Sequence, residues 1–86
     1  MNINELIAIV KKKINEKIVI ERINIEDKSF LHKNHKGHQE GKFHLKLAIS
    51  SIELNKLNKL TATKKIYKIL DIEIKEHIHS IQILFN

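Results

Sequence analysis

Histidine is the residue type in this chain with the clearest capacity for chemistry. Four of the six histidines lie within residues 32–44, together with both glycines, and the other two are His77 and His79. Imidazole titrates near neutral pH, and its neutral form is the commonest metal ligand in proteins. The clustering is therefore the best indication of function in the sequence.

Composition excludes several kinds of site. The chain has 86 residues and no cysteine, so it cannot by itself build a disulfide, a thiol nucleophile, or a cysteine-ligated zinc site or cluster. A core of this size leaves little room for a deep catalytic cleft, and no nucleophile–base pair is recognisable. We therefore expect one non-enzymatic domain over residues 1–86, in which any soft metal needs ligands from a partner.

No segment suggests a membrane. Met1 to Val10 lacks a cationic leader, and no apolar run approaches the roughly 20 residues that span a bilayer. These features predict a soluble, cytoplasmic protein without a membrane partner.

The basic charge is a weaker signal than the histidines. The formal net charge is +6, but Ile, Lys and Asn supply 40 of the 86 residues, and all three have A/T-rich codons, so base composition accounts for part of the lysine content. Arg22 is the only arginine, and bidentate recognition of guanine is mainly an arginine task. Base-specific nucleic-acid recognition is therefore disfavoured.

Hydrophobic periodicity predicts the elements that must position the histidines. Helical spacing predicts a helix over the first residues, with Asn2 and Glu5 as a capping box. Alternating β-branched residues predict a strand over 18–26, and residues 27–41 have no sustained apolar period, which predicts a long loop. The clearest strand covers 43–50, where we expect His44 to face solvent or the loop.

The second half of the chain predicts one helix and a last strand. A helical face runs through residues 62–74, with Thr61 or Thr63 as its cap. β-branched alternation predicts a strand over 78–85, with His79 on the same side as Ile81. The order α-β-β-α-β predicts a small α+β domain, a three-stranded mixed sheet with helices on one face.

Several short motifs resemble those of the BolA family and occur in the same order. The family's loop pattern D-x-S-x-x-H-x-x-H-x-G is matched by Asp27, Ser29, His32, His35 and Gly37. Its His-Phe pair, strand-closing serine, hydrophobic-Tyr pair and hydrophobic-His pair are matched by His44 with Leu45, Ser51, Ile66 with Tyr67, and Ile78 with His79. The resemblance covers nearly the whole chain and implies a fold related to the class II KH domain.

The resemblance implies an adaptor that pairs with a monothiol glutaredoxin and its glutathione. The resemblance further implies that the two proteins share a 2Fe-2S cluster, in iron-sulfur trafficking or iron sensing. The positions of the family's ligands are occupied here by His79 and, from the loop, His35; His32 and His38 are additional metal candidates with weaker support. Imidazole can replace thiolate on one iron of such a cluster and must be neutral to do so. Isolated, the protein is expected to hold no cluster and to be a monomer or weak homodimer.

A nucleic-acid function of the family competes with the adaptor role. It is that of a KH-like transcriptional regulator of stress response or morphology, with weak, salt-sensitive contacts. The candidate contacts are Lys56, Lys59, Lys64 and Lys65. The family's Arg-His-Arg segment appears here as Ala62, Thr63 and Lys64, which argues against DNA regulation.

The loop histidines have two further interpretations, a zinc site and plain solvation. His32, His35 and His38 offer three imidazoles, but a hydrolytic zinc site also needs a pocket and a carboxylate base. Histidines in a loop that contains glycine are solvated by default. His77 matches no family position and is expected on the surface.

Overall fold

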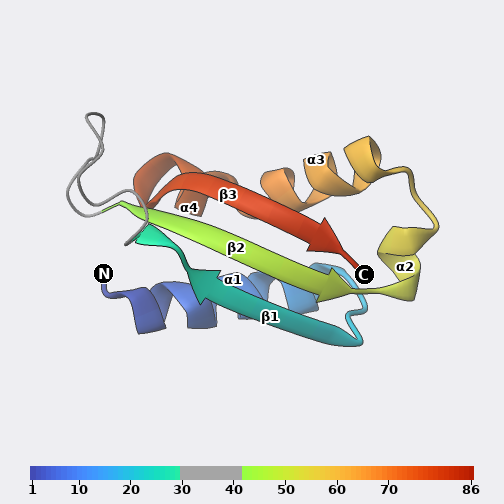
Figure 1. The fold of residues 1–86 in the computed structure, drawn as a ribbon, viewed down its shortest axis with the longest axis horizontal. Coiled ribbons are helices and arrows are strands. Elements are labelled where there is room, and N and C mark those ends of the chain that lie inside the picture. The colour runs from blue at the N-terminus through green and yellow to red at the C-terminus, as the bar shows by residue number, and fades with distance from the viewer. Residues whose placement is uncertain (30–41) are drawn as a thin grey trace.

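The computed structural model describes residues 1–29 and 42–86, which form a three-stranded sheet with helices on one face (Figure 1). In chain order the elements are α1 (Ile3–Lys17), β1 (Arg22–Asp27), β2 (Phe43–Ser50), α2 (Ile52–Asn55), α3 (Lys59–Ile69), α4 (Asp71–Glu76) and β3 (Ile78–Phe85). The predicted α+β fold is confirmed.

β2 is the central strand of the sheet. It pairs antiparallel with β1 and parallel with β3. A parallel partner requires a crossover connection, and α2, α3 and α4 supply it on the face that α1 also covers. Because successive side chains on a strand point to opposite faces, Leu45, Leu47 and Ile49 are buried in the core, whereas Lys46 lies on the outer face.

The helices bury one stripe each against the sheet. α1 contributes Leu6, Val10 and Ile14 to the core, at the spacing of one helical face. The crossover contributes Leu54, Ala62, Ile66 and Leu70. Within residues 1–29 and 42–86, no helix combines the length and apolar character that a bilayer crossing needs.

The start of α1 confirms the predicted capping box. Asn2 Oδ1 accepts a hydrogen bond from the Glu5 backbone N–H at 2.9 Å, and Asn2 Nδ2 donates to Glu5 Oε1 at 3.0 Å. Glu5 therefore returns to the side-chain amide of the cap, rather than to its backbone N–H. Either contact holds Glu5 in the first turn, where its charge suits the helix dipole.

Two predicted element boundaries differ from the structure. The first strand begins at Arg22 instead of residue 18, because Ile18 still donates its N–H to Ile14 as the C-cap of α1. The predicted helix over 62–74 is two helices, α3 and α4, with Leu70 between them. The cap is neither Thr61 nor Thr63, since Asn58 Oδ1 accepts the Thr61 N–H at 2.8 Å.

Candidate functional site

β3 begins with a bulge at His79. Phe43 of β2 lies opposite Ile78, but the next residue, His44, lies opposite Ser80, so His79 is an extra residue on β3. A bulge interrupts the alternation of faces and re-aims the side chain that it carries. The prediction that His79 continues the alternation of Ile81 is therefore wrong, and the His79 side chain is exposed.

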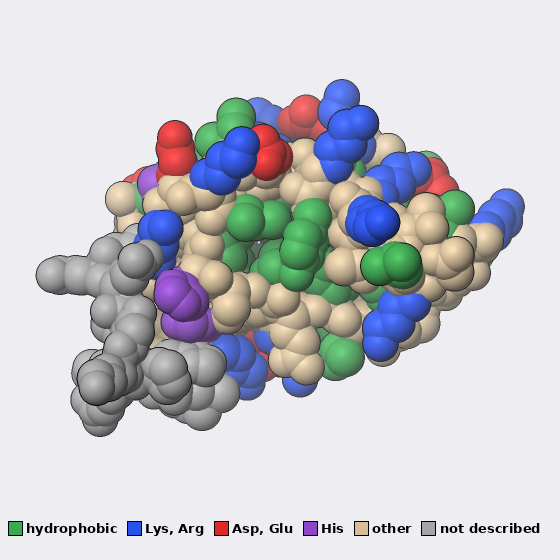
Figure 2. Space-filling model, turned by 90° about the horizontal axis from the view of Figure 1, so that it is seen from above, with side chains coloured by type: hydrophobic (Ala, Val, Ile, Leu, Met, Phe, Trp, Pro, Cys, Tyr) green, Lys and Arg blue, Asp and Glu red, His purple; other side chains and the backbone are tan. Residues whose placement is uncertain are grey.

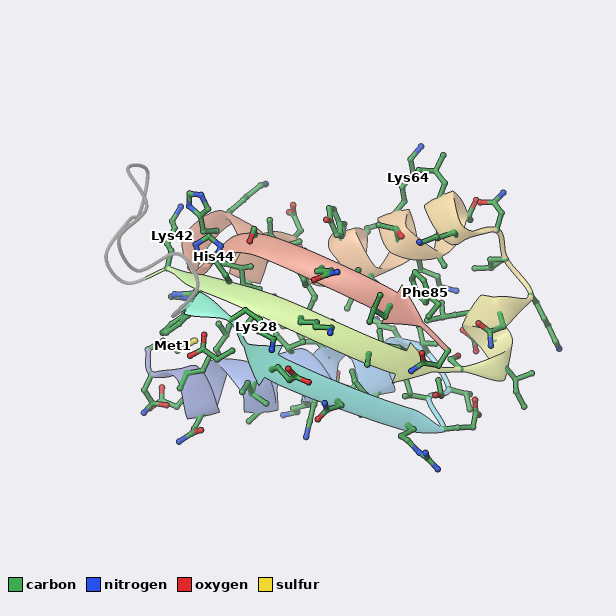
Figure 3. The ribbon with its side chains drawn as sticks, viewed as in Figure 1. Met1, Lys28, Lys42, His44, Lys64 and Phe85 are labelled. Atoms are coloured by element: carbon green, nitrogen blue, oxygen red, sulfur yellow. The ribbon has the colours of Figure 1, made fainter. Side chains whose placement is uncertain are left out.

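His44 lies near the start of β2 (Figure 3). It is buried, and its ring contacts His79 and Ser80. Only 6% of His44 is exposed, and its Nδ1 lies 2.6 Å from Ser80 Oγ. The ring centroids of His44 and His79 are 4.8 Å apart, with the planes tilted by 44°. Of the two predicted environments for His44, solvent is wrong, because two β3 side chains lie against its ring. The loop remains a prediction, since most of that loop lies outside the described residues.

Hydrogen bonds around Ser29 tie the end of β1 to the same place. Ser29 Oγ accepts a hydrogen bond from the His44 backbone N–H at 3.0 Å, and Lys28 N–H donates to the His44 carbonyl at 2.7 Å. Asp27 Oδ1 in turn accepts the Ser29 N–H at 2.9 Å. Asp27 and Ser29, two residues of the loop pattern, thus fix how the chain leaves β1 beside His44.

Three of the predicted ligands lie outside the described residues. His32, His35 and His38 fall within 30–41, and their roles stay predictions. In residues 1–29 and 42–86, no group of three or more His, Cys, Asp or Glu side chains is arranged to hold a metal ion. The described part of the chain therefore offers one exposed imidazole, His79, and needs further ligands from elsewhere.

His77 is separate from the contact between His44 and His79. Its side chain is partly buried, with Nε2 3.7 Å from Glu76 Oε2. Its carbonyl accepts a hydrogen bond from the Phe43 N–H at 2.9 Å, which closes the β2–β3 ladder next to the bulge. Figure 2 shows the histidine side chains of this face at one end of the molecule, with most of the lysines farther away.

The outer face next to this site carries a carboxylate between lysines. Glu26 Oε2 lies 2.7 Å from Lys28 Nζ, and Glu26 is opposite Lys46 in the β1–β2 register. The hydrogen bond from Lys28, with the attraction of Lys28 and Lys46, keeps the pKa of Glu26 below its usual value. Glu26 is therefore ionised at neutral pH.

Sequence reasoning overlooked Ser80 as a site residue. Nothing in its own identity marks it, but it directly follows His79, and its hydroxyl contacts a histidine 36 positions away. The family's His-Phe pair was the available signal for His44. Pairing it with His79 required the register of β2 on β3.

Two of the four predicted nucleic-acid lysines line different hollows of the molecule. Lys56 lies between α2 and α3, and Lys64 is exposed on α3. Lys59 lines a small pocket near the end of β3, whereas Lys65 lines a groove against α1 and lies 3.5 Å from Glu53 Oε2. The connection between α2 and α3 contains no glycine, so it lacks the loop by which KH domains clamp a nucleic-acid backbone.

Comparisons with known proteins place this fold among solved structures. A family model described as "BolA-like protein" matches residues 14–85. The BolA domain of SufE1 from Arabidopsis thaliana is similar, with a TM-score of 0.78 and 21% identity over 100% of this chain and 93% of that chain. BolA1 from Arabidopsis thaliana is also similar, with a TM-score of 0.77 and 22% identity over 92% of this chain and 87% of that chain. BolA1 from Mus musculus has a TM-score of 0.71 and 17% identity over 90% of this chain and 60% of that chain. No curated protein matches the sequence.

Proposed function

Because the chain belongs to the BolA-like protein family, we propose that it is a non-enzymatic adaptor that pairs with a monothiol glutaredoxin. In this proposal, His79 and His35 ligate a 2Fe-2S cluster that the two proteins share, with thiolates from the glutaredoxin and its glutathione. The complex serves iron-sulfur trafficking or iron sensing.

The observation that carries the proposal is the position of His79. It is exposed, so a partner can reach it, and it is held between the buried Ile78 and the ladder residue Ser80. The His44 ring packs against it from β2. A ligand to a partner's cluster needs both properties, because an ordered side chain loses less entropy on binding.

The second ligand is attached to the same end of the sheet by sequence. His35 follows Ser29 by six residues and precedes Lys42 by seven. Six residues span at most about 22 Å when fully extended. Ser29 accepts the N–H of His44, whose ring contacts His79, so six residues are enough for His35 to serve as a ligand at the same site.

The imidazole nitrogens that this chain offers are suitable ligands for a 2Fe-2S cluster. A chain without cysteine enters an iron-sulfur site only through nitrogen or oxygen, and imidazole is an established ligand on one iron of a 2Fe-2S cluster. When bound, the cluster supplies one-electron redox chemistry. The imidazole must be neutral to ligate, so we expect sharing to weaken as the pH falls through the range in which histidine takes up a proton.

The test is a titration of this protein into a 2Fe-2S-loaded monothiol glutaredoxin, followed by visible absorption and circular dichroism. We expect a saturable spectral change at one chain per cluster. His79→Ala should abolish it, and His35→Ala should weaken it or alter the spectrum. His77→Ala is the matched control, because it removes a nearby imidazole that is partly buried and directed at Glu76.

Two outcomes would overturn the proposal. The first is an unchanged spectral response with His79→Ala. The second is no response from the wild type at neutral or mildly alkaline pH. In the second case, low-salt binding of nucleic acid to Lys56, Lys59, Lys64 and Lys65 becomes the function to test.

A further inference from the structure

A groove between α1 and α3 is a prominent hollow in the described part of the chain. Its volume is about 610 Å³, and both helices lie on the same face of the sheet (Figure 1). It is lined by Lys13, Glu16, Lys17, Lys65, Lys68 and Ile69. None of these residues belongs to the histidine site, and the volume falls in the range of small-molecule sites.

Lysines occupy both walls of this groove. Lys13 and Lys17 are four residues apart on α1, and Lys65 and Lys68 are three apart on α3. These spacings put each pair on one side of its helix. The two pairs therefore confront each other across the groove, where like charges repel unless an anion lies between them.

One lysine of each pair forms an ion pair with a glutamate, and the other does not. Lys13 Nζ lies 2.6 Å from Glu73 Oε2, and Lys65 Nζ lies 3.5 Å from Glu53 Oε2. Neither glutamate lines the groove, so these pairs fix the two ammonium groups from outside it. A lysine ammonium has three protons, which leaves donors on both for a ligand.

Lys17 and Lys68 are the unpaired members. Neither makes a side-chain hydrogen bond or ion pair with a residue in 1–29 or 42–86. Glu16 is the single acidic side chain on the walls, and Ile69 supplies an apolar surface. The groove therefore combines two unpaired ammonium groups, two that are paired with glutamates outside it, and one carboxylate on its walls.

We propose that the groove between α1 and α3 binds a small molecule with two or more linked phosphates. A diphosphate carries several acceptor oxygens and more than one charge, so it can contact ammonium groups on both walls at once. A single carboxylate offers two oxygens and cannot bridge the walls in this way. The absence of arginine from the walls is compatible with phosphate, which lysine binds as a point charge. Ile69 offers an apolar surface for an organic group attached to the phosphates, as in a nucleoside diphosphate.

The test is an amide NMR titration of the isolated protein with inorganic diphosphate, and in separate arms with ADP and citrate. We expect saturable shifts confined to the second half of α1 and to α3. Lys17→Ala and Lys68→Ala should each raise the dissociation constant about tenfold, as expected for loss of a charge-assisted hydrogen bond. Lys11→Ala removes the same charge from an exposed position of α1 outside the groove, and should change it less than twofold.

Comparison of the three ligands and of the lysine variants distinguishes a nucleotide from free diphosphate, and a specific site from non-specific attraction. Tighter binding of ADP than of diphosphate, with added shifts at Ile69, identifies a nucleotide; equal binding identifies the phosphates alone. Citrate binding as tight as diphosphate overturns the phosphate assignment. Equal effects of Lys11→Ala and Lys17→Ala, or shifts spread over all surface lysines, show non-specific attraction and overturn the site. No glutaredoxin is present, so the result is independent of the proposed adaptor role.

Discussion

Lys13 and Glu73 form an ion pair, and the free energy of unfolding should fall far more when the lysine is removed than when the glutamate is removed. Glu73 is 5% exposed, its Oε2 lies 2.6 Å from Lys13 Nζ, and its Oε1 has no hydrogen-bond partner in the described structure. Lys13→Met would leave a buried carboxylate without its counter-charge. Glu73→Met would leave a lysine whose side chain is already 35% exposed and can turn to water.

The magnitudes follow from this difference in exposure. Breaking a buried pair by removing one partner costs about 3 to 5 kcal/mol, and partial solvation of Lys13 places Lys13→Met near the lower end, at about 3 kcal/mol. Glu73→Met should cost about 1 kcal/mol. The double variant should be close to the wild type, because apolar side chains replace both charges. For a domain of this size, 3 kcal/mol lowers Tm by roughly 15 °C.

Urea unfolding followed by far-UV circular dichroism at pH 7 measures all three variants. Lys75→Met is the control, since it breaks an exposed pair with Asp71 at 3.2 Å and should cost about 0.5 kcal/mol or less. A loss of stability with Lys13→Met no larger than that with Glu73→Met would show that burial of the Glu73 carboxylate does not set the cost. The result bears on the site as well, because the Glu73 carbonyl holds the His77 N–H at 2.8 Å, next to the start of β3.

Three further predictions concern single contacts. Ser80→Ala removes the hydroxyl from His44 and should cost about 1 kcal/mol in urea unfolding, with a changed His44 ring resonance in NMR; an unmoved resonance contradicts the contact. Asn58→Ala removes the cap of α3 and should also cost about 1 kcal/mol, whereas Asn58→Gly should cost less. Glu26 has a lowered pKa through Lys28, so its stabilisation is present above its unfolded pKa of about 4.5 and is lost as the pH falls through the lower folded pKa; Glu26→Gln should reduce this loss in acid unfolding curves.

Local patterns were enough to predict most of the fold. The alternation of Leu45, Leu47 and Ile49 predicted β2, and Asn2 with Glu5 predicted the start of α1. Each pattern depends on residues within a few positions of one another. The division of the crossover at Leu70 and the choice of Asn58 as a cap were missed, because Thr61 and Thr63 are also acceptable caps by residue type.

The geometry of the site depends on residues that are distant in sequence. The bulge is visible only in the register of β2 on β3, where the strand-pairing partner of His44 is Ser80 instead of His79. Each strand alone has a regular alternation that predicts no bulge. The same holds for Lys13 and Glu73, which are 60 positions apart. Their pairing depends on how α1 and α4 pack, which no local pattern encodes.

The bulge also gives the two histidines different roles. His44 is buried, and a buried imidazole needs hydrogen-bond partners, one of which is Ser80. His79 is exposed one residue earlier on the same strand and is available to a partner protein. Deleting the extra residue would leave Ile78 opposite Phe43 and Ser80 opposite His44, so the later β3 side chains would keep their faces and only the imidazole would be lost. The extra residue thus allows Ile81 and Ile83 to reach the core while His79 is presented outside it, which is the arrangement that an adaptor with an imidazole ligand requires.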